Sequence, residues 1–311
     1  MGFVQPLSFT PIYQQRVWGG RALAGTLGRR IPDGVPIGES WDLVDRPDAQ
    51  SVVDTGSCAG MTLHQLWTEH RADVFGDNLP ESERFPMLFK ILDASALLSL
   101  QVHPPEKQVA EFGGESKTEA WVFLEAKPEA EVYVGFRNGV TRAEFESTLT
   151  TGRIEPLLHR LQVKAGDTIF VPSGRCHAIG AGCLIAEVQQ NSDTTYRAFD
   201  WNRVGLDGKP RDLHQAESLA CINFDDHEPG LTLPDGESVV SCPFFRVARW
   251  QLEAPRLDLE GAAFFLVTQG AVECGGRTFQ RGTTFLLPKE ARTLPLSPLF
   301  PDTELLRATL R

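Results

Sequence analysis

Short runs of hydrophobic residues, separated by turn-forming residues, extend along the whole chain. The 28 glycines and 21 prolines are spread along its length, and the runs between them are rich in Val, Ile, Phe and Leu. This texture is typical of many strands joined by turns. We therefore predict that this chain of 311 residues has a mainly β fold of the barrel or sandwich type. The expected strands are 120–124, 131–136, 168–171, 184–188, 245–252, 262–267, 272–274 and 278–287.

Helices are expected to be few and short. In a capping box, a Thr side chain and a Glu or Gln three residues later bond each other's backbone N–H and start a helix. Three pairs have this spacing or resemble it, and apolar residues at helical intervals follow each of them. The pairs are Thr62 with Gln65, Thr141 with Glu144, and Asp212 with Gln215. We expect these helices to lie against a barrel.

A polar, turn-rich segment at 225–237 predicts a boundary between two domains. We place the domains at 1–232 and 233–311. The last histidine is His227, so any site that uses imidazole must belong to the first domain. The second domain has no acidic cluster or histidine of its own, and we expect it to cover apolar surface of the first.

Charge and composition exclude several classes of protein. The 41 acidic against 30 basic residues give a net charge of −11, which argues against a chain that binds nucleic acid or an anionic membrane surface. No run approaches the roughly 18 apolar residues of a membrane span, and the start lacks the basic and apolar stretches of a secretory signal. We expect a cytoplasmic protein. The six cysteines are scattered, which predicts neither disulfides nor a cysteine-rich zinc site.

Three separated fragments carry candidate metal ligands. Gln101 and His103 lie two residues apart, so they face the same side of an extended strand. Glu119 enters an apolar strand, and His177 ends the pattern G-x5-P-x-G-x-x-H that begins at Gly166. The first two fragments, taken alone, are also compatible with solvated strands, whereas the third is more specific. Together they offer two imidazoles, a carboxylate and an amide, a set that suits zinc or another first-row divalent ion.

The turn that ends at His177 resembles the second cupin motif, and cupins are jelly-roll barrels with a metal inside. A wider set of segments resembles the type I mannose-6-phosphate isomerases, in their short bacterial form. These segments are 11–20, 37–41, 89–92, 99–104, 117–121, 166–177 and 191–197, with a fainter similarity from 242 onward. The resemblance implies two cupin-type barrels, and a zinc-dependent aldose–ketose isomerase that interconverts mannose 6-phosphate and fructose 6-phosphate. It assigns Gln101, His103, Glu119 and His177 as ligands of one zinc ion.

The reaction and the resemblance suggest further roles. Moving a proton between C1 and C2 passes through a cis-enediol and needs an acid–base group. Lys117 lies near a ligand, where a bound cation should lower its pKa. Glu187 lies in an apolar strand, where burial should raise its pKa, although Glu187 could instead face outward. Both are candidates. Arg197 is a candidate helper at the sugar oxygens. Ser99 and Lys90 are candidates for substrate binding, and which basic residue meets the phosphate stays open.

Two other functions fit parts of the pattern. A metal-dependent cupin oxygenase would use the same ligands but leaves the segments around Lys117 and Arg197 without a role. A non-catalytic sugar-binding bicupin leaves the acid–base candidates unexplained. The expected partner is a sugar phosphate, and the chain could be a monomer or a homodimer.

Overall fold

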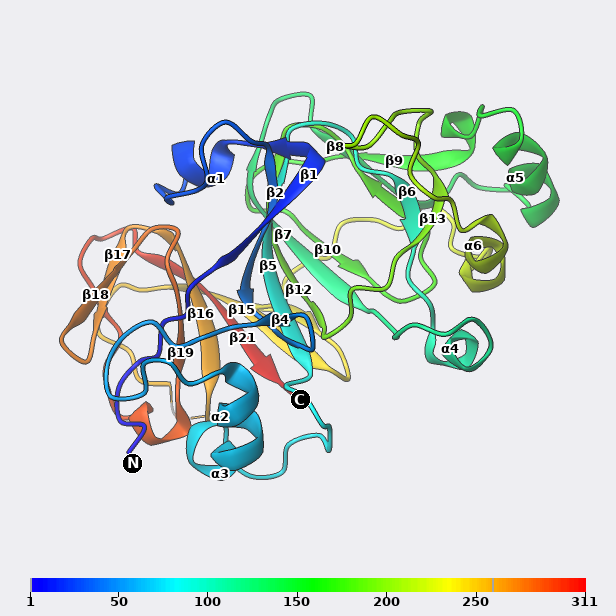
Figure 1. The fold of residues 1–311 in the computed structure, drawn as a ribbon. Coiled ribbons are helices and arrows are strands. Elements are labelled where there is room, and N and C mark those ends of the chain that lie inside the picture. Colours follow the sequence, from blue (N-terminus) through cyan, green and yellow to red (C-terminus); the bar gives the residue numbers. More distant parts are fainter. Residues whose placement is uncertain (1, 259) are drawn as a thin grey trace.

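The computed structural model describes residues 2–258 and 260–311. In it, 39% of residues lie in strands and 14% in helices, so the prediction of a mainly β fold is confirmed. The strands form two groups of sheets (Figure 1). Within the described residues, no helix is both long and apolar enough to cross a membrane.

The first group consists of two facing sheets built from residues 12–199. The first sheet contains, in spatial order, β1 (Ile12–Gly20), β2 (Ile37–Leu43), β5 (Met87–Ala94), β12 (Cys183–Gln190), β7 (Glu119–Ala126) and β10 (Thr168–Val171). The second sheet contains β13 (Tyr196–Phe199), β6 (Leu100–Val102), β11 (His177–Ile179), β8 (Glu131–Phe136) and β9 (Leu158–Gln162). A small ribbon pairs β3 (Asp45–Arg46) with β4 (Ala49–Gln50).

The second group follows the predicted boundary. Its larger sheet has the order β14 (Ser238–Ser241), β15 (Phe245–Gln251), β21 (Glu304–Leu310), β16 (Ala263–Gln269) and β19 (Thr284–Leu287). Its smaller sheet has the order β18 (Arg277–Gln280), β17 (Ala271–Cys274) and β20 (Ser297–Pro298). The expected strand 278–287 is wrong as one element, because a turn at Gly282, with a φ of 82°, separates β18 from β19.

The helices are short and lie outside the sheets. They are α1 (Ala22–Gly25), α2 (Leu63–Glu69), α3 (Arg71–Val74), α4 (Glu106–Phe112), α5 (Arg142–Leu149) and α6 (Gln215–Cys221), with 3-10 turns η1 (Glu155–Leu157) and η2 (Lys289–Ala291). The capping box at Thr62 is confirmed, and Thr141 caps α5. The predicted cap at Asp212 is wrong, since α6 starts from His214 without a side-chain cap.

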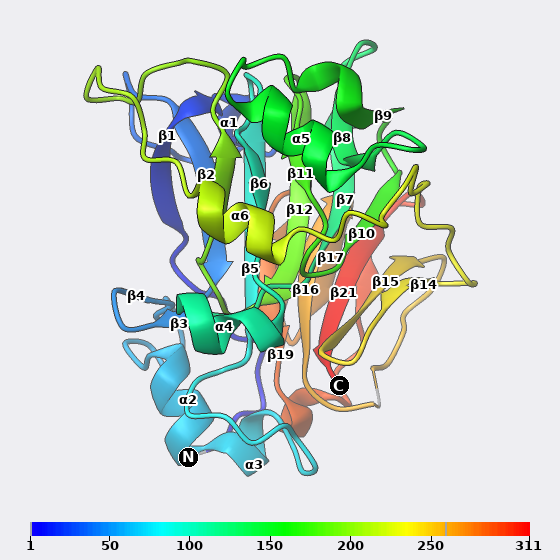
Figure 2. The same cartoon turned by 90° about the vertical axis from the view of Figure 1, so that its right-hand side faces the viewer.

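Both outer faces of the two facing sheets are covered. Helices α5 and α6 lie over β6, β8 and β11 (Figure 2), where apolar side chains of the two helices and of the second sheet share one core. On the other side, β5 and β12 pack against the large C-terminal sheet, with the rings of Phe89 and Phe264 4.9 Å apart. Side chains that alternate with these apolar ones point into the space between the two sheets, and this is where the site lies.

The two groups of sheets share more than one contact. Leu7, ahead of β1, pairs with Leu286 of β19, so the first residues of the chain pack on the C-terminal sheets. The domain boundary at 232 and the closure of each group into a cupin barrel stay predictions.

Candidate metal centre and substrate cavity

Strand register brings three of the predicted residues into one row of the second sheet. Arg197 of β13 lies opposite Gln101 of β6, which lies opposite His177 of β11. Residues directly opposite each other in an antiparallel pair point to the same face of the sheet. Because Leu100 and Val102 face the α-helical side, this row faces the interior.

A second row crosses the first sheet. Lys90 of β5 lies opposite Glu187 of β12, which lies opposite Trp121 of β7. Glu119 precedes Trp121 by two residues and therefore shares its face. The two rows face each other across the space between the sheets, so residues far apart in sequence form one site.

The two imidazoles and one carboxylate converge at the centre. The ligand atoms of His103, Glu119 and His177 all lie within 4.8 Å of one another, and the three residues are buried. His103 Nε2 is 3.5 Å from Glu119 Oε2, and His177 Nε2 is 3.5 Å from Glu119 Oε1. Gln101 adjoins them, with its Nε2 3.2 Å from His177 Nε2. Rotating this amide would present its oxygen at the same place.

The backbone fixes which nitrogen each histidine offers. His103 Nδ1 donates to the Thr194 carbonyl at 2.8 Å, and His177 Nδ1 donates to the Arg175 carbonyl at 2.9 Å. Burial lowers the pKa of both imidazoles, that of His177 to about 3. Both rings are therefore neutral, with the Nε2 lone pair turned toward Glu119, which is the arrangement of metal-binding histidines.

Glu119 supplies the test of whether this cluster suits a cation. Among the described residues, neither of its buried oxygens has a hydrogen-bond partner. Burial would raise the pKa of this carboxyl, but Lys117 and His103 hold it well below its usual range. An ionised, buried carboxylate is costly unless cations balance it. Lys117 lies 2.5 Å from Oε2, whereas Oε1 faces the neutral His177 ring at 3.5 Å. The donor set therefore fits a divalent metal ion.

Lys117 adjoins the cluster. Its ammonium lies 2.5 Å from Glu119 Oε2, 3.2 Å from His103 Nε2 and 3.8 Å from Glu187 Oε1. Burial would lower the pKa of Lys117, but the two carboxylates raise it above its usual range. The sequence-based expectation was a lowered pKa next to a bound cation. In this structure the group is held protonated.

Glu187 faces the interior rather than solvent. It is 3% exposed, and its Oε2 accepts a hydrogen bond from Trp121 Nε1 at 3.2 Å. Burial, followed by the charge of Glu119, raises its pKa to about 7 despite Lys117 and Lys90. Such a carboxyl exchanges protons near neutral pH.

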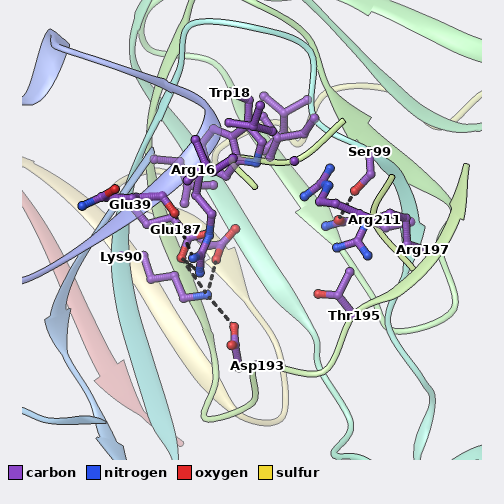
Figure 3. A pocket seen from close by; sticks show the side chains of 18 of the residues that line it. Arg16, Trp18, Glu39, Lys90, Ser99, Glu187, Asp193, Thr195, Arg197 and Arg211 are labelled. Atoms are coloured by element: carbon purple, nitrogen blue, oxygen red, sulfur yellow. Dashed lines mark hydrogen bonds and ion pairs between the residues drawn. The ribbon is translucent and has the colours of Figure 1, made fainter. Parts of the chain in front are cut away.

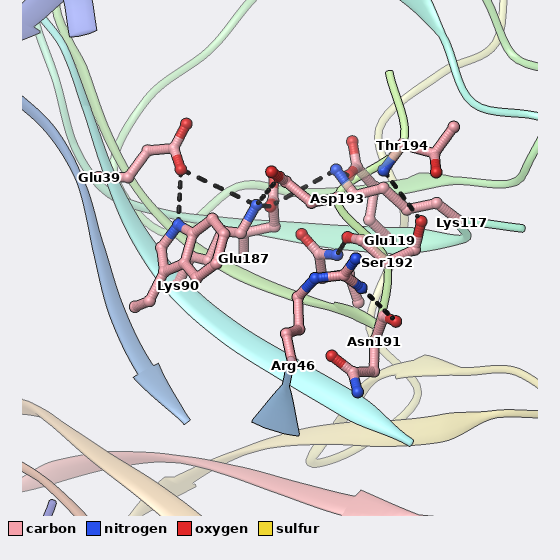
Figure 4. A network of polar contacts seen from close by, with 12 residues as sticks. Glu39, Arg46, Lys90, Lys117, Glu119, Glu187, Asn191, Ser192, Asp193 and Thr194 are labelled. Carbon is pink, nitrogen blue, oxygen red and sulfur yellow. Dashed lines mark hydrogen bonds and ion pairs between the residues drawn. The ribbon is translucent and has the colours of Figure 1, made fainter. Parts of the chain in front are cut away.

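Lys90 lies in a different environment from the one a phosphate-binding lysine needs. Its ammonium is 3.9 Å from Glu39, 3.8 Å from Glu187 and 3.5 Å from Asp193 (Figure 4). It also sits 4.8 Å from the ring centre of Trp41. Three carboxylates thus surround this single cation.

Sequence reasoning gave no role to Glu39 and Arg16. Glu39 accepts from Arg16 Nε at 2.9 Å and from Trp41 Nε1 at 2.6 Å. Burial would raise the pKa of Glu39, but Lys90 and Arg16 lower it to about 2. The segment around Glu39 carries part of the family resemblance, but no local pattern shows that β1 and β5 bring two cations to it.

All these side chains open onto one cavity of about 540 Å³, a size usual for small-molecule sites. Figure 3 shows Glu39, Lys90, Glu187 and Asp193 on one side and Ser99, Arg197 and Arg211 on the other. Ser99 Oγ donates to Gln101 Oε1 at 3.2 Å. Of the predicted residues, His103 and His177 lie beneath the cavity wall, and the others line it.

Comparison with known proteins agrees with this site. A sequence model of the family described as phosphomannose isomerase type I, catalytic domain, matches residues 7–139. The chain is 37% identical over 301 residues to mannose-6-phosphate isomerase ManA of Bacillus subtilis, covering 91% of this chain and 93% of that one. It is 35% identical over 304 residues to the mannose-6-phosphate isomerase of Streptococcus mutans, covering 93% and 94%.

A solved structure is similar over the whole length. The crystal structure of the mannose 6-phosphate isomerase from Bacillus subtilis superposes with a TM-score of 0.86 at 30% identity, and covers 98% of this chain and 99% of that one. Fold, site and relatives together define an aldose–ketose isomerase. The chain belongs to the type I phosphomannose isomerase family. The oxygenase and the non-catalytic bicupin receive no support from these matches.

Proposed function

We propose that this enzyme interconverts mannose 6-phosphate and fructose 6-phosphate through a cis-enediol, with one zinc ion held by Gln101, His103, Glu119 and His177. The observation that carries the proposal is the buried His–Glu–His cluster, in which Glu119 Oε1 has no hydrogen-bond partner among the described residues. The cluster lies at a cavity large enough for a sugar phosphate. Bound zinc would supply positive charge next to the sugar oxygens as they become negative.

Lys117 and Glu187 are the proposed proton-transfer groups. Their charged atoms lie 3.8 Å apart on one side of the cavity, so both can reach neighbouring atoms of one bound sugar. The Glu187 carboxylate, with its pKa of about 7, is suited to take a proton from carbon. The protonated Lys117 is suited to donate to a sugar oxygen.

Arg197, Ser99 and Lys90 are proposed to hold the substrate. Arg197 lies beside Gln101 across the strand pair, and its guanidinium can steady an oxygen near C1 and C2. Ser99 and Lys90 line opposite sides of the same cavity. We also propose residues 1–232 as the catalytic unit and 233–311 as its support.

The test combines metal analysis with an assay of mannose 6-phosphate conversion. The purified enzyme should contain about one zinc per chain, lose activity to a chelator and regain it with zinc. In deuterated water, a cis-enediol route should place deuterium from solvent on the product carbon, as seen by NMR. Deuterium uptake would support the proton-transfer route, and absence of conversion by the zinc-loaded enzyme would contradict the function.

A further inference from the structure

The substrate's two functional ends make different demands on the cavity. Proton transfer takes place at C1 and C2, whereas the phosphate is carried on C6 at the other end of the sugar. A phosphate dianion needs a region with excess positive charge, away from carboxylates. The two sides of the cavity differ in this respect.

The side of the cavity that holds Lys90 lacks the excess positive charge that a phosphate dianion requires. Glu39, Glu187 and Asp193 all lie within 3.9 Å of the Lys90 ammonium. Arg16 is itself engaged by Glu39. Carboxylates therefore outnumber free cations here, and a dianion placed beside Lys90 would be repelled.

On the opposite side, the guanidinium groups of Arg197 and Arg211 line the cavity. One buried carboxylate, Asp200, lies among them and is paired with Arg211 and with Arg203, which does not line the cavity. Asp212, the other carboxylate near Arg197, is exposed. Burial, followed by the charge of Arg211, lowers the pKa of Arg197, which reflects guanidinium groups held close together. The buried Arg197 Nε has no hydrogen-bond partner among the described residues. Asp207 is the other carboxylate that lines the cavity here, and it is exposed, with its Oδ1 accepting from the Lys209 backbone N–H at 3.0 Å.

Arg211 is the member of this cluster best placed for an anion. Its Nε and Nη2 donate to Asp200 at 2.7 and 2.6 Å, which fixes the plane of the guanidinium. No partner for Nη1 is present in residues 2–258 and 260–311. Arg211 lines the cavity and Arg203 does not. Figure 3 shows Arg211 beside Ser99 and Arg197, across the cavity from Lys90.

We propose that Arg211 recognises the substrate's phosphate group, next to Arg197 and Ser99, and that Lys90 contacts the sugar instead. This assignment rests on the proposed use of the cavity for a sugar phosphate. Asp200 then acts as a positioning residue, because it holds the Arg211 fork in one orientation. The loop that follows β13 thereby makes the enzyme specific for phosphorylated sugars.

The experiment compares variants of the zinc-loaded enzyme. Arg211→Gln should raise the KM for mannose 6-phosphate and the inhibition constant of inorganic phosphate, each by roughly 10- to 100-fold, with a smaller effect on kcat. Arg211→Lys keeps the charge but loses the fork, and should give an intermediate increase. Titration calorimetry with inorganic phosphate measures the loss of phosphate affinity without turnover. Circular dichroism verifies that each variant is folded.

Arg203→Ala is the matched control. Arg203 also donates to Asp200, at 2.9 Å, but it does not line the cavity, so both constants should stay within about threefold of wild type. If Arg203→Ala and Arg211→Gln raised the two constants equally, the cause would be the lost attachment of the loop to Asp200. That result would overturn the assignment of Arg211 to the phosphate. Wild-type constants in Arg211→Gln, with raised constants in Lys90→Met, would also overturn it. If the wild-type enzyme failed to convert mannose 6-phosphate, the proposed function would fail, while phosphate calorimetry would still test Arg211.

Discussion

Removing the Glu39 carboxylate should weaken the fold in a way that depends on pH. Glu39 is 8% exposed and pairs with Arg16 at 2.9 Å and Lys90 at 3.9 Å. These cations, against the cost of burial, lower its pKa from 4.5 to about 2. A shift of this size corresponds to about 3 kcal/mol of folding free energy at neutral pH.

The sign follows from the direction of the shift. The folded protein holds the Glu39 proton less tightly than the unfolded chain, so the stabilisation is complete well above pH 4.5 and is lost as pH falls toward 2. By pH 3, about 2 of the 3 kcal/mol should have disappeared. Glu39→Gln cannot titrate, so its deficit relative to wild type should shrink over the same interval.

Urea unfolding of both proteins at several values between pH 7 and pH 3 measures the difference. Glu69→Gln removes an exposed carboxylate on α2 and controls for the change in net charge. A deficit of Glu39→Gln that stays constant across this range would refute the reasoning, because the free-energy difference would then not arise from ionisation. If the stability deficit of Glu39→Gln instead grew toward low pH, the pKa of Glu39 would be raised in the folded protein rather than lowered.

Three further predictions concern the metal, the base and the C-terminal sheets. His177→Ala should lose bound zinc, measured by elemental analysis, together with activity, while the fold seen by circular dichroism is retained. In the wild type, kcat/KM should rise with pH through about 7 as Glu187 loses its proton, and Glu187→Gln should lose at least about 100-fold in activity along with this pH dependence. Phe264→Ala, at a site 1% exposed, should cost about 3–5 kcal/mol in urea unfolding, whereas Leu299→Ala, 49% exposed, should cost less than about 0.5 kcal/mol. Equal losses in these last two would contradict the packing argument.

The candidate metal cluster could be predicted from the sequence because its signals are local. Gln101 and His103 share a strand face by their spacing of two, and the turn before His177 has a recognisable pattern of glycine and proline. The mainly β fold followed from the same kind of local evidence. These local signals predict His103, Glu119 and His177 as one set, and in the structure their ligand atoms lie within 4.8 Å of one another.

The charge environment could not be predicted in this way, because it depends on which strands become neighbours. Lys90 resembles a free phosphate-binding lysine in the sequence. Only the pairing of β5 with β2 and β12 brings Glu39 and Glu187 beside it. Arg211 lies in a loop without periodicity, so nothing local indicated that Asp200 holds it at the cavity. The prediction of one strand over 278–287 passed over a local turn signal, because the polar residues Gln280 to Thr284 around Gly282 separate Phe279 of β18 from Phe285 of β19.

The C-terminal sheets contribute to the site although they supply none of the proposed ligands. Along β5, Phe89 and Ile91 pack into the core shared with Phe264, while Lys90 between them points into the cavity. Because neighbouring side chains of a strand project to opposite faces, fixing the apolar face also fixes the direction of Lys90. The same holds for β12, where Ala186 and Val188 flank Glu187. A loosened interface should therefore displace charged groups in the cavity, so Phe264→Ala should raise the KM for mannose 6-phosphate as well as lower stability. An unchanged KM in that variant would show that β5 and β12 hold their positions without support from behind.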